Sequence, residues 1–474
     1  MRRLSARRGL LYAGLAICAM LFFINFLSFQ QRDQPPWAVS LTGASAVAPR
    51  SRSLSGSRNG TGPPVPRPVA SAGSAAAAPK ASPLREPGSN VVSADDGTLL
   101  VPEDRHWFFS GGRRKPGPGS LPRELALWPE EDGGDRIVNQ LLYRPPPADS
   151  SSWPPRKLKK ILLYDGFGAR LKTGQEEFVR NGCPVNTCEL TTSRSQIDTA
   201  DAVLFKDRFH GPHGQRRPGQ AWIMYLLECP MHTVSFKHVQ PLFNWTATYR
   251  HDSDIVAPYE KWVYYDDSVH FRKQEINYAA KKTKKVAWFV SNCGAINKRL
   301  QYAKELAKYI EVDIYGSCGT KKCPRSMGKK CFEKLSNEYK FYLAFENSNC
   351  RDYITEKFFV NGLQHNVLPI VMGAHPDDYK RAAPEHSYIH VDDFKSPQEL
   401  ADFLHALDRD DHLYNSYFQW KGTGEFINTY FFCRLCAMLH DEGHQKTIPD
   451  LNEWWRGAGT CVTGKWPRYT PERT

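Results

Sequence analysis

The sequence predicts an α/β protein of two doubly wound lobes behind a membrane anchor and a disordered stem. Strands and helices alternate in two successive series, the pattern of parallel sheets covered by helices. The first series lies in residues 157–283 and the second in residues 284–440, followed by a C-terminal extension, residues 441–474. The cleft between two such lobes is the usual place for a ligand.

An almost wholly apolar run, Leu10 to Phe29, predicts a transmembrane helix. Its length gives about 30 Å of helix, which is enough to cross a hydrocarbon core. The arginines that precede it favour a cytoplasmic tail, residues 1–9, and a lumenal position for the rest. We therefore expect an uncleaved signal-anchor; the alternative, a cleaved signal peptide, lacks a small-x-small cleavage site after the apolar run.

Residues 30–156 are rich in Pro, Ser, Gly, Ala and Arg and show little periodicity. Such a composition buries too little apolar surface to offset the entropy of ordering, so we expect a largely disordered stem. The stretch from Leu121 to Leu142 is more apolar and is expected to pack on the head. Asn59 in the stem and Asn244 in the first lobe begin N-glycosylation sequons.

The net charge of +13 is spread along the chain without a long basic stripe. A nucleic-acid partner is therefore not expected, whereas an anionic small substrate suits a mildly basic folded region. Of the 12 cysteines, Cys18 lies in the apolar run. An odd number remains on the lumenal side, where disulfides form, so at least one is expected to be free or to pair externally.

Three buried strands are predicted in the first lobe: Lys159–Gly166, Ala202–Lys206 and Trp222–Glu228. A polar, looped region is expected from there to about Lys285. Glu228 ends the third strand beside a proline-containing turn. A carboxylate at a strand end that faces the cleft is a candidate to accept a proton from a hydroxyl, although an ion pair and a helix cap are open alternatives.

The second lobe is predicted to contain five strands: Val286–Ser291, Val312–Tyr315, Phe341–Phe345, Val367–Met372 and Tyr388–Val391. One helix places Ala303, Leu306, Ala307 and Ile310 on a single face. A second helix opens at Ser396, with Pro397 at its first position and Glu399 completing a capping box.

Two helix starts in the second lobe carry cations. Ser291 and Asn292 lead into a helix with Lys298 and Arg299 in its first turn. Backbone N–H groups plus an arginine fork make a pyrophosphate site, and a capped surface helix is the alternative. Lys357 falls in another first turn, where the helix dipole disfavours a cation, so we expect an anion to bind there.

Two metal-like patterns are interpreted as structural. Asp252-Ser253-Asp254 mimics the D-x-D clasp of metal-dependent nucleotide-sugar transferases, but it lies in the lobe opposite Arg299. Cys433-x-x-Cys436 has no second pair of ligands, so zinc is not expected. The sequence requires no cofactor, and manganese stays open as an activator.

Six blocks in one order resemble the α1,3-fucosyltransferases, enzymes that use GDP-fucose, over residues 159–436. They are ILLYDGFG, ADAVLFK, LECPMHT, FNWTATYRHDSDI, the strand with Ser291 and Asn292 before Arg299, and FENSNCRDYITEKF. Cys229 stands where the Lewis-type members usually have serine. The SNCG block, the FENSNCRDYITEKFF wording and the longer C-terminus look similar to the enzymes that fucosylate the innermost GlcNAc of N-glycans.

The resemblance implies the two-lobed GT-B architecture, with Glu228 as the catalytic base. Arg299 and Lys357 would neutralise charge on the departing GDP in place of a divalent cation, Glu356 would contact sugar hydroxyls, and Asp352 would orient the loop. An N-terminal cysteine pair, Cys183 and Cys188, would be tied to a C-terminal pair, Cys433 and Cys436. The implied donor-binding set is Ser291, Asn292, Arg299, Asn347, Tyr353, Glu356 and Lys357.

The function implied by the resemblance is an inverting transfer of L-fucose from GDP-β-L-fucose to the 3-hydroxyl of a GlcNAc. The expected acceptor is the innermost, Asn-linked GlcNAc of N-glycans on glycoproteins. The enzyme is expected to be a single-pass type II protein of the Golgi membrane, with its catalytic region in the lumen. Lewis-type transfer to antennal GlcNAc is one alternative. A metal-dependent transferase of another nucleotide sugar, using Asp252 and Asp254, is a second, and a non-catalytic lectin or chaperone is a third.

Overall fold

The computed structural model describes most of the chain after residue 156 and parts of the segment before it. The predicted anchor, Leu10–Phe29, and Asn59 lie outside the described residues. Within the part of the chain that is described, no helix is both long and apolar enough to cross a membrane. The described ranges are 91–92, 102–116, 125–131, 133–145, 157–168, 170–211, 216–239, 241–441, 443–444 and 446–466.

The first lobe contains a five-stranded parallel sheet in the order β3-β2-β4-β5-β6. The three predicted strands are confirmed as β2, β4 and β5. The fifth strand, β6, falls in the region that we expected to be looped; its four residues are all buried, and it pairs with β5. The bounds are β2 Lys159–Leu163, β3 Cys188–Thr191, β4 Ala202–Lys206, β5 Ala221–Leu226 and β6 Trp245–Thr248.

The second lobe contains a second five-stranded parallel sheet in the order β10-β9-β11-β13-β14. Its central strand β11 is buried along its whole length, because helices cover both faces of a parallel sheet. Phe341, Leu343 and Phe345 of β11 belong to one core cluster, and Tyr342 and Ala344 to the other. The bounds are β9 Lys284–Phe289, β10 Val312–Tyr315, β11 Tyr339–Phe345, β13 Leu368–Met372 and β14 Ile389–His390.

The helices of the second lobe include both of the predicted ones. The capping box at Ser396 is one-sided: Ser396 Oγ accepts the Glu399 N–H at 3.2 Å, but Glu399 Oε2 accepts the N–H of Lys395 at 2.6 Å instead of that of Ser396. The bounds are α4 Arg299–Leu306, α5 Gly328–Glu338, α6 Glu356–Phe358, α7 Pro376–Ala382, α8 Pro397–Arg409 and α9 Asp411–Ser416, with a π-helical turn, η5, over Phe359–Leu363.

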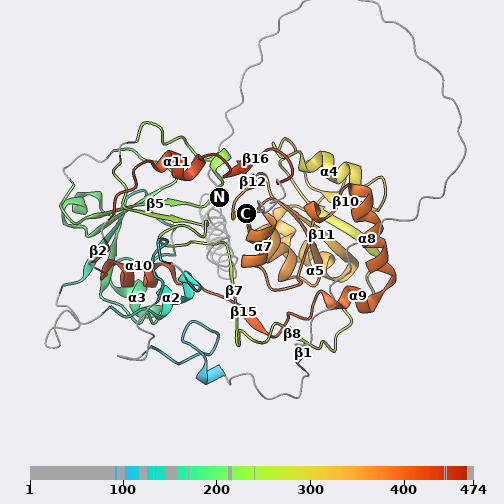
Figure 1. The fold of residues 1–474 in the computed structure, drawn as a ribbon, viewed down its shortest axis with the longest axis horizontal. Coiled ribbons are helices and arrows are strands. Elements are labelled where there is room, and N and C mark those ends of the chain that lie inside the picture. The colour runs from blue at the N-terminus through green and yellow to red at the C-terminus, as the bar shows by residue number, and fades with distance from the viewer. Residues whose placement is uncertain are drawn as a thin grey trace, which may run out of the picture. The chain divides into compact units, whose positions relative to one another are not determined.

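After the second lobe the chain returns to the first. Strand β15 (Gly424–Ile427) pairs antiparallel with β7 (Lys261–Tyr264), and α10 (Phe431–Leu439) then packs beside α2 (Arg136–Leu142) and α3 (Glu176–Arg180), as Figure 1 shows. Disulfides Cys183–Cys433 and Cys188–Cys436 fix α10 there. The structure thus contains both bonds that the resemblance implied, and they hold the returning chain against the first lobe.

Part of the predicted stem also lies against the first lobe. Gln140 of α2 is buried and accepts a hydrogen bond from Arg434 Nη1 at 3.1 Å. Trp128 stacks on His444 with 3.6 Å between ring centroids. The remaining elements are β1 Val91–Val92, β8 Phe271–Arg272, β12 Asn349–Cys350, α11 Leu451–Arg456, β16 Cys461–Val462 and the short 3-10 turns at 102–104, 194–199, 230–232, 325–327 and 391–393.

Candidate active site

Glu228 lies just beyond the end of β5 and is half-buried. Its Oε1 accepts hydrogen bonds from the Tyr353 hydroxyl at 2.6 Å, the Cys229 N–H at 3.0 Å and the Asn347 amide at 3.5 Å. Its other oxygen, Oε2, accepts no hydrogen bond from the described residues. The carboxylate is thus held through one oxygen, and the second is available to another donor.

Tyr353 and Asn347 come from the second lobe, on either side of β12, so they join Glu228 to the segment that resembles the fucosyltransferase signature. Tyr353 is 2% exposed. Burial, with the nearby Tyr259 and Glu228, holds the pKa of Tyr353 well above its usual value. The phenol therefore keeps its proton and acts as the donor.

Lys357 lies in the first turn of α6, where the sequence placed it, but its nearest anions are residues of the chain itself. Its ammonium is 2.9 Å from Glu346 Oε2 and 3.2 Å from Glu356 Oε1, and it donates to Thr355 Oγ1 at 2.8 Å. Burial alone would lower the pKa of Lys357, but the two carboxylates outweigh burial and raise it. The lysine is a firmly charged cation with all three N–H groups used.

Glu346 lies in the FENSNCRDYITEKF block, but sequence reasoning assigned it no role in the site. It follows β11 directly and is fully buried, and its carboxylate also accepts the backbone N–H and the hydroxyl of Thr355 at 2.8–2.9 Å. An ionisable residue at the end of a wholly apolar strand was the available signal, because a buried charge needs a partner of opposite sign.

Arg299 begins α4, as predicted, but its side chain is turned inward and is 4% exposed. Its guanidinium donates to the carbonyls of Phe345 at 2.7 Å and Asn292 at 3.2 Å. Its Nε is buried and finds no partner among the described residues. The exposed Lys298 precedes the helix with a left-handed backbone and contributes no side-chain cap.

The two cations therefore meet at one place, the end of β11. Arg299 contacts the carbonyl of Phe345, and Lys357 contacts the side chain of the next residue, Glu346. The loop that carries the exposed Ser291 and Asn292 follows β9, the neighbouring strand, and is tied by the disulfide Cys293–Cys318.

Asp352 connects the two lobes at the signature segment. It has a left-handed φ of 56°, and its Oδ2 lies 2.6 Å from His251 Nδ1 of the first lobe. Its Oδ1 accepts from Arg381 at 3.1 Å. Burial raises the pKa of Asp352, but His251 and Arg381 lower it more, to about 2, so the carboxylate is ionised.

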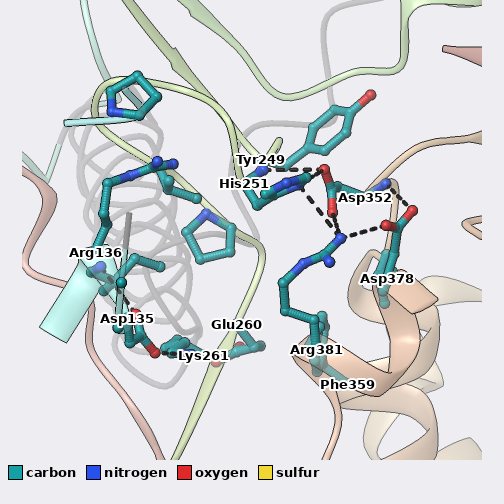
Figure 2. A pocket seen from close by; sticks show the side chains of 18 of the residues that line it. Asp135, Arg136, Tyr249, His251, Glu260, Lys261, Asp352, Phe359, Asp378 and Arg381 are labelled. Atoms are coloured by element: carbon teal, nitrogen blue, oxygen red, sulfur yellow. Dashed lines mark hydrogen bonds and ion pairs between the residues drawn. The ribbon is translucent and has the colours of Figure 1, made fainter. Parts of the chain in front are cut away.

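A cavity of about 540 Å³ lies beside this contact and is lined by both lobes and by residues around the start of α2. Figure 2 shows Arg136 and Glu260 on one side of it and the linked His251, Asp352 and Arg381 on the other. Burial raises the pKa of Glu260 to about 7. None of the seven candidate donor-binding residues lines this cavity.

Asp252 and Asp254 have the contacts of structural residues. Asp252 pairs with Arg250 at 2.5 Å; Asp254 is buried, accepts from Thr246 and pairs with Lys446 at 2.5 Å. Two groups of metal-ligand residues occur within the described ranges. The first group is Cys188, Cys436 and His440, and its two sulfurs are joined in a disulfide. The second group is Glu130, Asp254 and His444, and the ammonium of Lys446 pairs with both of its carboxylates.

The cysteines of the described residues form five disulfides and leave Cys229 as the free, buried thiol. Burial raises the pKa of Cys229 to about 11, so it stays protonated. The expected unpaired cysteine is therefore the one next to Glu228.

Comparison with known families gives two adjacent matches. Residues 156–260 match the N-terminal domain of fucosyltransferases, and residues 279–454 match the C-terminal domain of glycosyltransferase family 10 (fucosyltransferase). These ranges contain Glu228 and all of the candidate donor-binding residues.

Two relatives show the extent of the similarity. A Drosophila melanogaster protein described as glycoprotein 3-alpha-L-fucosyltransferase A is 56% identical over 387 residues, which are 78% of this chain and 76% of the relative. A Homo sapiens protein described as a 4-galactosyl-N-acetylglucosaminide 3-alpha-L-fucosyltransferase is 40% identical over 273 residues, 55% of this chain and 73% of the relative.

A solved structure of an alpha1,3-fucosyltransferase with GDP-fucose is 18% identical and covers 66% of this chain and 97% of its own. Its TM-score is 0.39.

Proposed function

This chain belongs to glycosyltransferase family 10, the fucosyltransferases, and we propose that it transfers L-fucose from GDP-β-L-fucose to the 3-hydroxyl of the innermost GlcNAc of N-glycans. The observation that carries the proposal is the contact of Glu228 with Tyr353 and Asn347. It brings the candidate base of one lobe to the candidate donor site of the other. The similarity to the Drosophila glycoprotein 3-alpha-L-fucosyltransferase A supports the acceptor.

In the proposed reaction, Glu228 accepts the proton of the acceptor hydroxyl through its available oxygen, Oε2. The acceptor oxygen then attacks C1 of fucose as the bond from C1 to the phosphate oxygen of GDP breaks. A single displacement converts the β-linkage of the donor into an α-linkage in the product. The Tyr353 hydroxyl orients the carboxylate and leaves the reacting oxygen uncovered.

The leaving group gains negative charge on its diphosphate, and Arg299 and Lys357 supply the stabilising cations. Arg299 keeps N–H groups beyond the two that bind carbonyls, including its unpartnered Nε. Lys357 has to exchange one contact, and the partly exposed Glu356 is the partner that can leave. Glu356 would then be free to accept a fucose or ribose hydroxyl.

Two of the three alternatives are enzymes, and they differ from the main proposal in metal use and in acceptor. A metal site at Asp252 and Asp254 gains no support, because Arg250 and Lys446 neutralise these carboxylates. The observation that supports Lewis-type transfer to antennal GlcNAc is the similarity to the human relative, which covers a shorter part of the chain. It differs from the main proposal only in the acceptor.

The test is an assay of the purified secreted protein with GDP-fucose, an N-glycan that lacks antennal lactosamine, and an N-acetyllactosamine acceptor. We expect mass spectrometry to find fucose α1,3-linked to the innermost GlcNAc, with turnover persisting in EDTA. Fucose on the lactosamine acceptor alone would establish the Lewis-type alternative. Absence of transfer to every acceptor would overturn the proposed function.

For location, we propose a single-pass type II protein of the Golgi membrane, anchored by Leu10–Phe29, on the strength of that apolar run and the arginines before it. Protease protection in sealed Golgi vesicles provides the measurement. A protease added outside is expected to remove only the cytoplasmic tail; digestion of the lobes would contradict the orientation.

A further inference from the structure

Residues 446–466, here called the strap, run across the molecule after α10 and take no part in the proposed chemistry. The strap starts on the first lobe, where the Asn244 amide donates to the Lys446 carbonyl at 2.7 Å and the Ile448 N–H to the Phe243 carbonyl at 2.8 Å. Figure 1 shows α11 of the strap over the first lobe and β16 beside β12. The matched family domain ends at residue 454, within α11.

The first half of the strap holds the loop that follows Glu228. The Trp455 indole donates to Thr233 Oγ1 at 2.9 Å, and Arg456 Nη2 donates to the Val234 carbonyl at 2.8 Å. The Phe236 N–H donates to Asn452 Oδ1 at 3.1 Å. This loop therefore rests on α11 through three side chains of the strap.

The second half of the strap holds the signature segment, which here means residues 347–353 of the block that resembles the fucosyltransferases. Cys461 forms a disulfide with Cys350, and β16 pairs antiparallel with β12. The Arg351 N–H donates to the Thr460 carbonyl, and the Asn349 amide to the Gly464 carbonyl, both at 2.8 Å. Cys350 lies midway in the chain between Asn347 and Tyr353, the two residues that contact Glu228.

These attachments are close together along the strap. Arg456 on one side and Cys461 on the other are five residues apart, which limits their separation to about 17 Å even in an extended chain. Trp455, Cys229, Cys350 and Tyr353 also share one buried apolar cluster. The strap thus limits how far the Glu228 loop and the signature segment can move apart.

We propose that the strap is a positioning element of the active site, which sets the separation between the Glu228 carboxylate and the donor held by the second lobe. The inference rests on the proposed function for the identity of the reaction. Arg299 and Lys357 make their contacts within the second lobe, so loosening the strap disturbs the alignment of base and donor more than the binding of GDP. Misalignment of about 1 Å can cost on the order of 100-fold in rate.

The first test compares Cys350→Ser/Cys461→Ser with a matched control, Cys323→Ser/Cys331→Ser, which removes a disulfide away from the strap. We expect kcat of the strap variant to fall at least about tenfold, with GDP affinity by calorimetry within about threefold of wild type. The control is expected to keep kcat. An unchanged kcat, an equal fall in the control, or an equal loss of GDP affinity would overturn the proposal.

A second pair of variants leaves the disulfide intact. Arg456→Gln removes the contacts with Thr233 and Val234, whereas Arg456→Lys keeps one charged donor. We expect kcat to fall in the first and to be partly rescued in the second. Equal values of kcat in wild type and Arg456→Gln would count against a positioning role.

Hydrogen exchange separates failure of this inference from failure of the proposed function, because it needs no turnover. In Cys350→Ser/Cys461→Ser, exchange is expected to rise both in residues 228–236 and in residues 347–353, while β9 and β13 stay protected. If only residues 347–353 responded, the strap would not connect the two segments. A wild-type protein inactive on every acceptor would overturn the function and leave this result decisive.

Discussion

At the scale of single residues, hydrogen bonds and ion pairs between polar side chains fix the geometry of the site. Glu228 uses one carboxylate oxygen for three donors, and Lys357 uses all three of its N–H groups. Sequence reasoning identified both residues from their position at strand and helix ends. It assigned no role to Glu346: a charge at the end of an apolar strand calls for a partner, but that the partners are Thr355 and Lys357 is apparent only when β11 and α6 are placed together.

Asn244 begins a glycosylation sequon, but its contacts argue against a glycan there. Its Oδ1 accepts the Trp222 N–H at 2.8 Å, and its amide nitrogen donates to the Lys446 carbonyl at 2.7 Å. Thr246 of the sequon is buried. A glycan on that nitrogen would break these bonds, so we expect glycopeptide mass spectrometry of the secreted protein to find Asn244 unmodified; a glycan at Asn244 would contradict this.

Glu260 is expected to make stability depend on pH. Burial raises its pKa from 4.5 to about 7, so its contribution to stability is full below pH 4.5 and is lost as the pH rises through about 7. Glu260→Gln removes that loss. We expect the Tm of this variant, relative to wild type, to be higher at pH 8 than at pH 5.

The matched control for Glu260 is Glu333→Gln, at an exposed position on α5. Thermal unfolding of both variants at the two pH values is the measurement. A relative Tm for Glu260→Gln that did not change with pH, or that changed equally in the control, would contradict burial as the cause.

At the scale of elements, the strands with continuous apolar runs were predictable and those paired by distant segments were not. All five strands of the second sheet were expected, because each reads as a buried parallel strand. The pair β7–β15 joins residues about 160 positions apart, and β12–β16 depends on the strap. Such pairings leave no periodic signal in a short window of sequence.

The turn from β11 to α6 shows a second limit of sequence reasoning. The cation in the first turn of α6 was expected to mark a bound anion, and within the chain itself Lys357 also pairs with the buried carboxylate of Glu346. Lys357 can therefore be tested in two roles. As a donor-binding residue it should affect GDP affinity, and as the partner of a buried carboxylate it should affect the free energy of unfolding.

Lys357→Met leaves the fully buried Glu346 without its cation. We expect the free energy of unfolding to fall by about 3–5 kcal/mol, the usual cost of breaking a buried ion pair. The double variant Lys357→Met/Glu346→Gln should recover part of that loss without recovering GDP affinity. Chemical denaturation and calorimetry measure the two quantities. A fully stable single variant would show that the pair is not structural.

At the scale of the whole molecule, the sequence predicted two doubly wound lobes, and both parallel sheets are present. The return of the chain to the first lobe was not predicted, because α10 follows the second lobe without a break in pattern. The cysteine pairing implied by the resemblance was the one clue: Cys433 and Cys436 pair with residues of the first lobe. The contact of Glu228 with Tyr353 depends on this arrangement of lobes and strap.

The most direct measurement is transfer by Glu228→Gln at saturating GDP-fucose and acceptor, with GDP affinity measured on the same protein. Glutamine keeps the size and can still accept the Tyr353 hydrogen bond, but it cannot take up a proton. We expect kcat to fall by a factor on the order of 100 to 10,000 while GDP affinity stays near that of wild type. Turnover at the wild-type rate would contradict a base of the first lobe that deprotonates the acceptor beside a donor held by the second lobe.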